Sequence, residues 1–131
     1  QNGYNATFVE SAALINNEMP KYVAGRALSM IDSNIRNPRV LIVGVAYKPN
    51  VADVRETAAE LVIEHLRARG AVVSWHDEVV GTWKGETSSP LAGADIAIVV
   101  TMHDSVNPKD VIASAPYVFD TTGKLKGVHG L

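Results

Sequence analysis

Four short apolar runs are spaced along most of the chain, separated by stretches of mixed polarity. They cover residues 39–45, 71–75, 95–101 and 117–120, and the first reads RVLIVGV. Runs of this length that are rich in β-branched residues are typical of strands buried on both faces, as in parallel sheets. We therefore expect four strands in one parallel sheet.

The stretch between the first two runs has the period of a helix. Apolar residues from Ala58 to Leu66 recur at spacings of three and four, and Gly70 follows as a C-terminal stop. Asp53 and Glu56 have the spacing of a capping box, which predicts that this helix begins near Asp53.

Two prolines mark shorter helices farther along the chain. Ser89-Pro90 could open a short helix after a polar, irregular stretch at residues 77–89, and Asn107-Pro108 opens another that runs through Ala115. Strands that alternate with helices in this order indicate an α/β fold with a Rossmann-like parallel sheet and flanking helices.

A helical segment precedes this pattern. Apolar residues recur at spacings of three and four over residues 6–34. Pro20 interrupts the run, so we expect a kink, or two helices that meet at residues 18–20. We divide the chain into a helical segment, residues 1–34, and a Rossmann-like domain, residues 35–131.

Composition narrows the functional classes. The 131 residues are 47% hydrophobic and carry a net charge of −2, which suits one globular domain and favours neither a nucleic-acid partner nor a membrane surface. No apolar run approaches the roughly 18 residues that span a bilayer. Because cysteine is absent, disulfides, thiolate metal sites and thiol catalysis are excluded, and we expect a cytoplasmic protein. The chain does not begin with Met, so we expect a piece of a longer protein.

Three loops follow the C-terminal ends of the expected strands, where ligands bind in open α/β sheets. They are residues 47–53, 76–80 and 102–107. Lys48 would precede a helix N-terminus, whose free N–H groups and dipole favour anions, and this arrangement suits a phosphate. A solvated lysine beside an ordinary capped helix is the alternative, and the pattern leaves both open.

The motifs of other ligand sites are missing. Only Gly44 follows the first strand, so neither G-x-G-x-x-G nor G-x-x-x-x-G-K-[ST] is present, and an independent NAD or ATP site is not expected. His76 and His103 both follow strands, but no H-E-x-x-H motif occurs and we expect no metal site. Arg55 would lie in a first helical turn, where a cation opposes the dipole, and this indicates a paired or ligand-facing arginine.

One segment resembles a known family. Residues 44–50 (GVAYKPN) followed by residues 53–57 (DVRET) resemble the G-x-x-[YF]-K-x-N-x-x-D-x-R-E-S-P segment of the UDP-glucose/GDP-mannose dehydrogenase family. Residues 15–20 are similar to the v-N-x-x-M-P junction that precedes the family's C-terminal domain. Residues 94–103 resemble its A-D-x-[IV]-[IV]-x-x-T-x-[HW] stretch, so the resemblance extends over nearly the whole chain.

The resemblance implies the UDP-binding, C-terminal domain of an NAD-dependent UDP-sugar 6-dehydrogenase, which oxidises the sugar C6 alcohol to a carboxylate. Tyr47, Lys48 and Asn50 would contact UDP, Arg55 would face the cleft on the cofactor side, and Asp53 would hold the loop. NAD would be bound mainly by an N-terminal domain missing from this chain. The catalytic cysteine is missing too, so no catalytic residue is assigned and the chain alone would not be catalytic.

The resemblance also suggests partners and leaves alternatives. Residues 1–34 would be the end of the central dimerisation helix and its junction, which could support a homodimer. His103 resembles the UDP-N-acetylhexosamine members, whereas Thr121-Thr122 stands where relatives often carry arginine, and Lys124 could take over that nucleotide contact. A stand-alone nucleotide-binding regulatory module and a structural or assembly domain are the alternatives.

Overall fold

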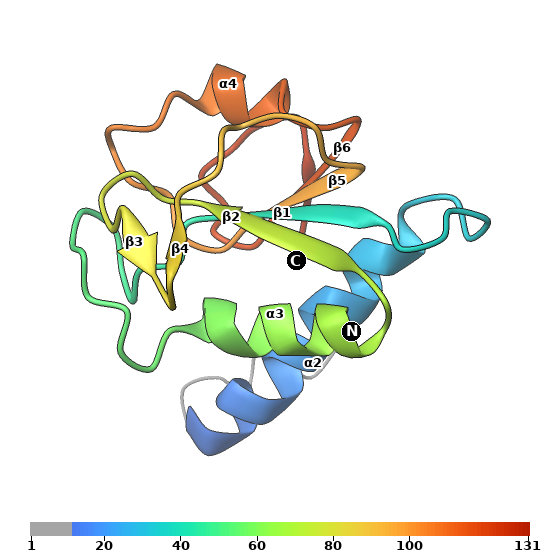
Figure 1. The fold of residues 1–131 in the computed structure, drawn as a ribbon, viewed down its shortest axis with the longest axis horizontal. Coiled ribbons are helices and arrows are strands. Elements are labelled where there is room, and N and C mark those ends of the chain that lie inside the picture. Colours follow the sequence, from blue (N-terminus) through green and yellow to red (C-terminus); the bar gives the residue numbers. More distant parts are fainter. Residues whose placement is uncertain (1–11) are drawn as a thin grey trace.

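A parallel sheet of five strands lies at the centre of the computed structural model, which describes the backbone of residues 12–131 and the side chains of residues 18–131 (Figure 1). The strands are β1 (Arg39–Val43), β2 (Val72–His76), β5 (Ile96–Val99), β6 (Tyr117–Asp120) and β7 (His129–Gly130). Their order is β2-β1-β5-β6-β7. Strand β1 pairs with β2 on one side and with β5 on the other, and the predicted α/β class with a parallel sheet is confirmed.

The helices cover both faces of this sheet. Helices α2 (Ala12–Ser29) and α3 (Ala58–Ala68) lie on one face and the short α4 (Pro108–Ile112) lies on the other (Figure 1). Successive strand side chains point to opposite faces. Val40 and Ile42 therefore join the core under α2 and α3, whereas Leu41 and Val43 join a second core beside Val111 of α4. Both faces of the central strands are buried, as the continuous apolar runs predict.

Helix α2 passes through Pro20 without ending, so the alternative of two helices is wrong. An interior proline removes one backbone hydrogen bond. The buried side chains of Val23, Ala24 and Ala27 pack in one core with α3 and the sheet, and this packing stabilises the helix beyond the proline. The helix ends at Ser29 rather than residue 34. Residues 6–11 of the expected helix lie outside the described residues.

The expected start of α3 at Asp53 is wrong. The helix begins at Ala58, and its N-cap is Thr57, whose hydroxyl accepts the Ala59 backbone N–H at 3.2 Å. Glu56 has φ = +54°, a left-handed conformation, so it cannot be part of a right-handed α-helix. The Asp53 carboxylate instead accepts the backbone N–H of Arg55 at 2.9 Å. Lys48 is therefore not at a helix N-terminus, and the phosphate argument from the helix dipole does not apply to it.

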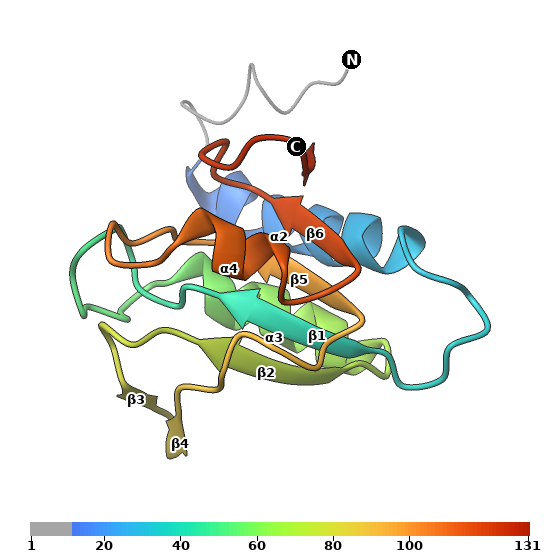
Figure 2. The same cartoon turned by 90° about the horizontal axis from the view of Figure 1, so that it is seen from above.

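The helix expected at Ser89-Pro90 is also absent. The Ser89 N–H donates to the Trp75 carbonyl at 2.7 Å, so this segment runs along the edge of β2 instead of coiling. A hairpin of β3 (Thr82–Trp83) and β4 (Glu86–Thr87) occupies the stretch expected to be irregular, and Figure 2 places it beside β2. Lys84 (φ = +52°) and Gly85 (φ = +78°) form its two-residue turn, in which both positions need positive φ.

The remaining elements agree more closely with the sequence. Helix α3 ends just before Gly70, and Asn107 caps α4, which stops at Ile112 instead of Ala115. Strand β7 was not expected, because only two residues of it pair with β6. Within residues 12–131, no helix is both long enough and apolar enough to cross a bilayer.

Candidate functional site

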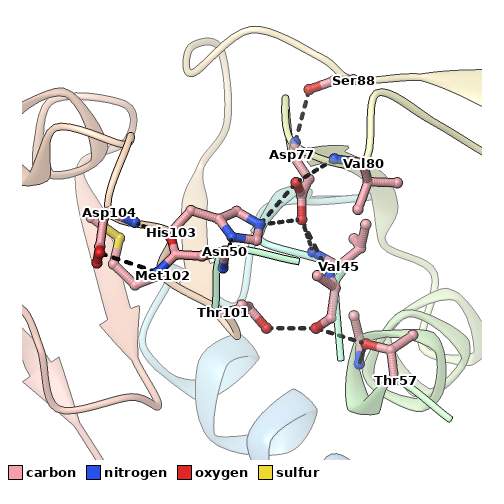
Figure 3. Close-up of polar contacts among 12 residues, drawn as sticks. Val45, Asn50, Thr57, Asp77, Val80, Ser88, Thr101, Met102, His103 and Asp104 are labelled. Atoms are coloured by element: carbon pink, nitrogen blue, oxygen red, sulfur yellow. Dashed lines mark hydrogen bonds and ion pairs between the residues drawn. The ribbon is translucent and has the colours of Figure 1, made fainter. Parts of the chain in front are cut away.

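The candidate site lies at the C-terminal edge of the sheet, between β1 and β5. In open α/β sheets, ligands bind beyond the strand ends at the point where the strand order reverses. That point lies beside β1 here, because β2 pairs with it on one side and β5 on the other. Residues 44–57 follow β1 and residues 100–107 follow β5. Figure 3 shows that side chains from these two loops and from the loop after β2 meet in one hydrogen-bonded group.

Asp77, the first residue after β2, is the centre of this group. Its side chain is fully buried, and its Oδ2 accepts the backbone N–H groups of Val45 at 2.9 Å and Ala46 at 3.2 Å. Its Oδ1 accepts the N–H of Val80 at 3.0 Å. One carboxylate therefore holds the loop after β1 against the loop after β2.

His103 connects the third loop to the same carboxylate. Its Nε2 lies 2.9 Å from both Asp77 oxygens, and its Nδ1 accepts the backbone N–H of Asn50 at 2.8 Å. An atom that accepts a hydrogen bond must carry a lone pair, so the ring proton is on Nε2 and the ring is neutral. We refer to these two buried side chains as the Asp77–His103 pair.

Two opposing effects set the pKa of Asp77. Burial raises the pKa of a carboxyl group, but the hydrogen bonds from His103, Val80 and Val45 stabilise the carboxylate and outweigh it. The pKa of Asp77 therefore lies below its ordinary value. The carboxylate stays ionised in the folded protein at neutral pH.

This lowered pKa predicts how folding depends on pH. A carboxyl group whose pKa is lower in the folded state stabilises the fold above its unfolded pKa, about 3.9, and that contribution is lost as the pH falls through the folded pKa. We expect the free energy of unfolding of the wild type to fall below about pH 4. Urea unfolding from pH 6 to pH 3 should give a shallower fall for Asp77→Asn. Glu64→Gln, which removes an exposed carboxylate on α3, is the control for the loss of one negative charge, and equal slopes for all three proteins would contradict the assignment.

Gly44 allows the loops after β1 and β5 to touch. Its φ is +86°, and a Cβ atom on it would lie 1.9 Å from the carbonyl oxygen of Thr101. The Thr101 hydroxyl also donates to the Ala46 carbonyl at 2.8 Å. A side chain at position 44 would meet the backbone of the loop after β5, so this close approach requires glycine.

Residues 47–53 form a loop that is fixed at its neck and its tip. At the neck, the Tyr47 N–H donates to the Asp53 carbonyl at 2.6 Å. At the tip, the Asn50 side chain donates to the Asp104 carboxylate at 3.1 Å and accepts the Asp104 N–H at 2.8 Å. The side chains of Tyr47, at the neck, and of Lys48, between the neck and the tip, are exposed, Tyr47 to 59%. Two side chains are thus presented to solvent on a held backbone.

Arg55 is a paired arginine outside any helix. Its guanidinium binds the Asp53 carboxylate at 2.8 Å while its side chain stays 86% exposed. These hydrogen bonds lower the pKa of Asp53 to about 2 and raise the pKa of Arg55. The conflict with a helix dipole that the sequence indicated does not arise, because α3 begins only at Ala58.

An open hollow of about 440 Å³ borders this edge on the α4 side, and its walls include His76, Glu78, Ser105, Asn107 and Asp110. The His76 ring forms a hydrogen bond with the Ser89 carbonyl at 2.7 Å, whereas His103 binds Asp77 and Asn50. Among the described residues, no three His, Cys, Asp or Glu side chains group in a way that could hold a metal ion.

The structure brings together some predicted site residues and adds others. Tyr47, Lys48 and Asn50 share one loop at the expected edge of the sheet. Asp77 lies in the expected loop of residues 76–80 and His103 was singled out by itself, but their pairing across 26 positions was missed. An aspartate after one strand and a histidine after another strand of the same parallel sheet were the available signal, since parallel strands end at the same edge.

The sequence is similar to a known family of enzymes. The family model for the UDP-glucose/GDP-mannose dehydrogenase family, UDP binding domain, matches residues 41–127. A UDP-N-acetyl-D-mannosamine dehydrogenase from Methanococcus maripaludis is 33% identical over 134 aligned residues, covering 93% of this chain and 31% of that protein. A UDP-glucose 6-dehydrogenase from Rhizobium meliloti is 26% identical over 69 residues, covering 53% of this chain and 16% of that protein. The chain spans about a third or less of the length of these relatives.

Solved structures share the fold. The UDP-N-acetyl-mannosamine dehydrogenase from Staphylococcus aureus matches with a TM-score of 0.72 at 22% identity, over 96% of this chain and 34% of that chain. A UDP-glucose dehydrogenase from Pyrobaculum islandicum matches with a TM-score of 0.61 at 24% identity, over 78% of this chain and 26% of that chain. At these identities the likeness concerns the fold alone, and it agrees with the Rossmann-like arrangement described above.

Proposed function

The chain belongs to the UDP-glucose/GDP-mannose dehydrogenase family, and we propose that it forms the wall that holds the UDP part of a UDP-sugar. The match to the family's UDP binding domain over residues 41–127 supports this proposal. The observation that carries it is the Tyr47–Asp53 loop, which is held at its neck and its tip and leaves Tyr47 and Lys48 exposed at the ligand-binding edge of the sheet.

Within this site, Lys48 would pair with the diphosphate and Tyr47 would contact the nucleotide. A lysine ammonium suits a phosphate as a point charge with three donors. The side chain of Asn50 is engaged with Asp104, so its proposed contribution is chiefly to hold the loop. Lys124 lies at the same edge, with its Nζ 3.5 Å from the Met102 carbonyl, and could approach the same ligand.

The activity proposed for the intact protein is the NAD-dependent oxidation of a UDP-sugar at C6 to a carboxylate. NAD would be bound mainly outside this chain, because the G-x-G-x-x-G turn of dinucleotide sites does not follow β1. Arg55 would face the cleft on that side with Asp53 holding its guanidinium. With no cysteine in its sequence, the isolated chain would not be catalytic. The proposal includes the missing domains as partners, a homodimer through the N-terminal helical segment, and a cytoplasmic location.

Titration of the chain with UDP tests the binding role. We expect weak binding that Lys48→Ala weakens about tenfold, equivalent to about 1.4 kcal/mol, because one charge-assisted contact to the diphosphate is lost. Amide chemical shifts would measure the affinity and locate the contact. Lys21→Ala, an exposed lysine on α2, is the matched control and should bind as the wild type does. Uridine should bind both lysine variants equally, since it lacks the phosphates.

Two results would count against this role. If UDP moved no amide of the wild type at several millimolar, this chain alone would not hold the nucleotide. If UDP bound and Lys48→Ala matched Lys21→Ala, the contact would be elsewhere on the chain.

A further inference from the structure

We propose that His103 is a positioning residue for the nucleotide, acting through the backbone of Asn50. This inference rests on the proposed function, because it concerns the loop that presents Tyr47 and Lys48. The Nδ1 atom of His103 accepts the Asn50 N–H at 2.8 Å and so fixes the tip of that loop. His103 itself is 1% exposed, so its effect on a ligand would be indirect.

The tip of the loop needs such support. Asn50 has φ = +68°, in the left-handed region. Asparagine adopts this region more readily than most residues but still favours its ordinary conformations, so contacts to other residues help to hold it there. Three hydrogen bonds reach Asn50 from the loop after β5, and one of them comes from the His103 ring. The other two involve Asp104, which is exposed, whereas the His103 bond is shielded.

The ring is held rigidly enough to transmit this position. Both carboxylate oxygens of Asp77 lie 2.9 Å from Nε2, and Asp77 is in turn fixed by backbone N–H groups from two loops. The carboxylate selects the tautomer that carries the proton on Nε2. That choice leaves Nδ1 as an acceptor directed at Asn50. His103 thus connects the loop tip to Asp77, a buried residue held directly after β2.

This support affects binding because it is in place before the ligand arrives. A loop already in its binding conformation loses less conformational freedom on association than a mobile one. Removing the Nδ1 acceptor should therefore leave the chain folded but let the tip move, and Lys48 would have to be ordered during binding. The expected effect is a UDP affinity that is about fivefold to tenfold weaker.

Two substitutions separate positioning from general stability. The amide of His103→Gln can reach the place of Nε2 and keep the donor to Asp77, but it leaves the Asn50 N–H without its acceptor. The amide of His103→Asn lies closer to the main chain, near Nδ1, and keeps an acceptor for Asn50 while losing the donor to Asp77. We expect His103→Gln to bind UDP about fivefold to tenfold more weakly, and His103→Asn to stay within about twofold of the wild type even if it melts at a lower temperature.

Hydrogen exchange at the Asn50 amide gives a second measurement that needs no ligand. Exchange should be at least about tenfold faster in His103→Gln than in the wild type, while the Val45 amide, held by Asp77, keeps its protection. Equal Asn50 exchange in the wild type and His103→Gln would overturn the proposal. So would equal losses of UDP affinity in both variants, which would indicate only a structural role. Failure of the wild type to bind UDP would sink the proposed function instead, and the exchange result would still decide whether His103 positions the loop.

Discussion

Replacing Gly44 with alanine should lower the free energy of unfolding by about 3 kcal/mol or more, or prevent folding. The added Cβ would lie 1.9 Å from the Thr101 carbonyl oxygen and 2.6 Å from its carbon. Both are backbone atoms, held in place by the pairing of β1 with β5, so neither loop can move aside cheaply. Chemical denaturation followed by circular dichroism would measure the change.

Gly123→Ala is a control matched in backbone conformation. Gly123 has φ = +77°, but an added Cβ there would meet nothing within 4 Å. This substitution should lower the free energy of unfolding only by the strain of an alanine in the left-handed conformation, about 1–2 kcal/mol. If Gly44→Ala cost no more than Gly123→Ala, the close approach of the two loops after β1 and β5 would be wrong.

Replacing Asp77 with alanine should destabilise the fold by roughly 3–5 kcal/mol. The change removes one carboxylate and leaves its partners without an acceptor in a buried place. These partners are the N–H groups of Val45, Ala46 and Val80 and the Nε2–H of His103. Each unsatisfied buried donor costs on the order of 1–3 kcal/mol, less whatever water can recover.

Asp95→Ala provides the comparison for this loss. The Asp95 carboxylate accepts one backbone N–H, that of Arg39, at 2.8 Å and at an exposed place. Its removal should cost about 1 kcal/mol or less, because water can replace the bond. Thermal and urea unfolding of both variants would measure the difference. Similar losses for the two aspartates would argue that Asp77 does not organise the three loops.

The strands could be predicted because their signal is local. Residues buried on both faces give an apolar run wherever the strand lies in the sheet, and all four expected runs became strands. The first expected strand was two residues too long, since Gly44 turns into a left-handed conformation that a run of apolar letters does not reveal. Strand β7 escaped notice because two paired residues leave no pattern.

The error at Asp53 also has a physical cause. An aspartate that caps a helix and one that forms an Asx turn both accept a backbone N–H two or three residues ahead. Asp53 binds the N–H of Arg55, and only the positive φ of Glu56 decides that no helix follows. The letters at residues 53–56 suit either outcome. The true cap, Thr57, is a residue type that often caps helices, but the capping-box spacing pointed to Asp53 instead.

The site was predicted as a loop but not as a connected group. Tyr47, Lys48 and Asn50 are close in sequence, so one segment was enough to single them out. The Asp77–His103 pair depends on two loops, and His103 meets Asn50 across 53 positions. No spacing rule predicts such contacts, because the sheet order that creates them is itself a tertiary property.

The Tyr47–Asp53 loop is held by its main chain, so the side chains at its exposed positions can be exchanged. Asp77 and His103 hold main-chain N–H groups, and neither Tyr47 nor Lys48 takes part through its side chain. The residues that hold the loop backbone are therefore different from Tyr47 and Lys48, the residues that face the proposed ligand. A combinatorial library at positions 47 and 48 could be selected for new anionic ligands while the loop keeps its backbone contacts. Proline at position 47 should be left out, because it would remove the N–H that donates to the Asp53 carbonyl.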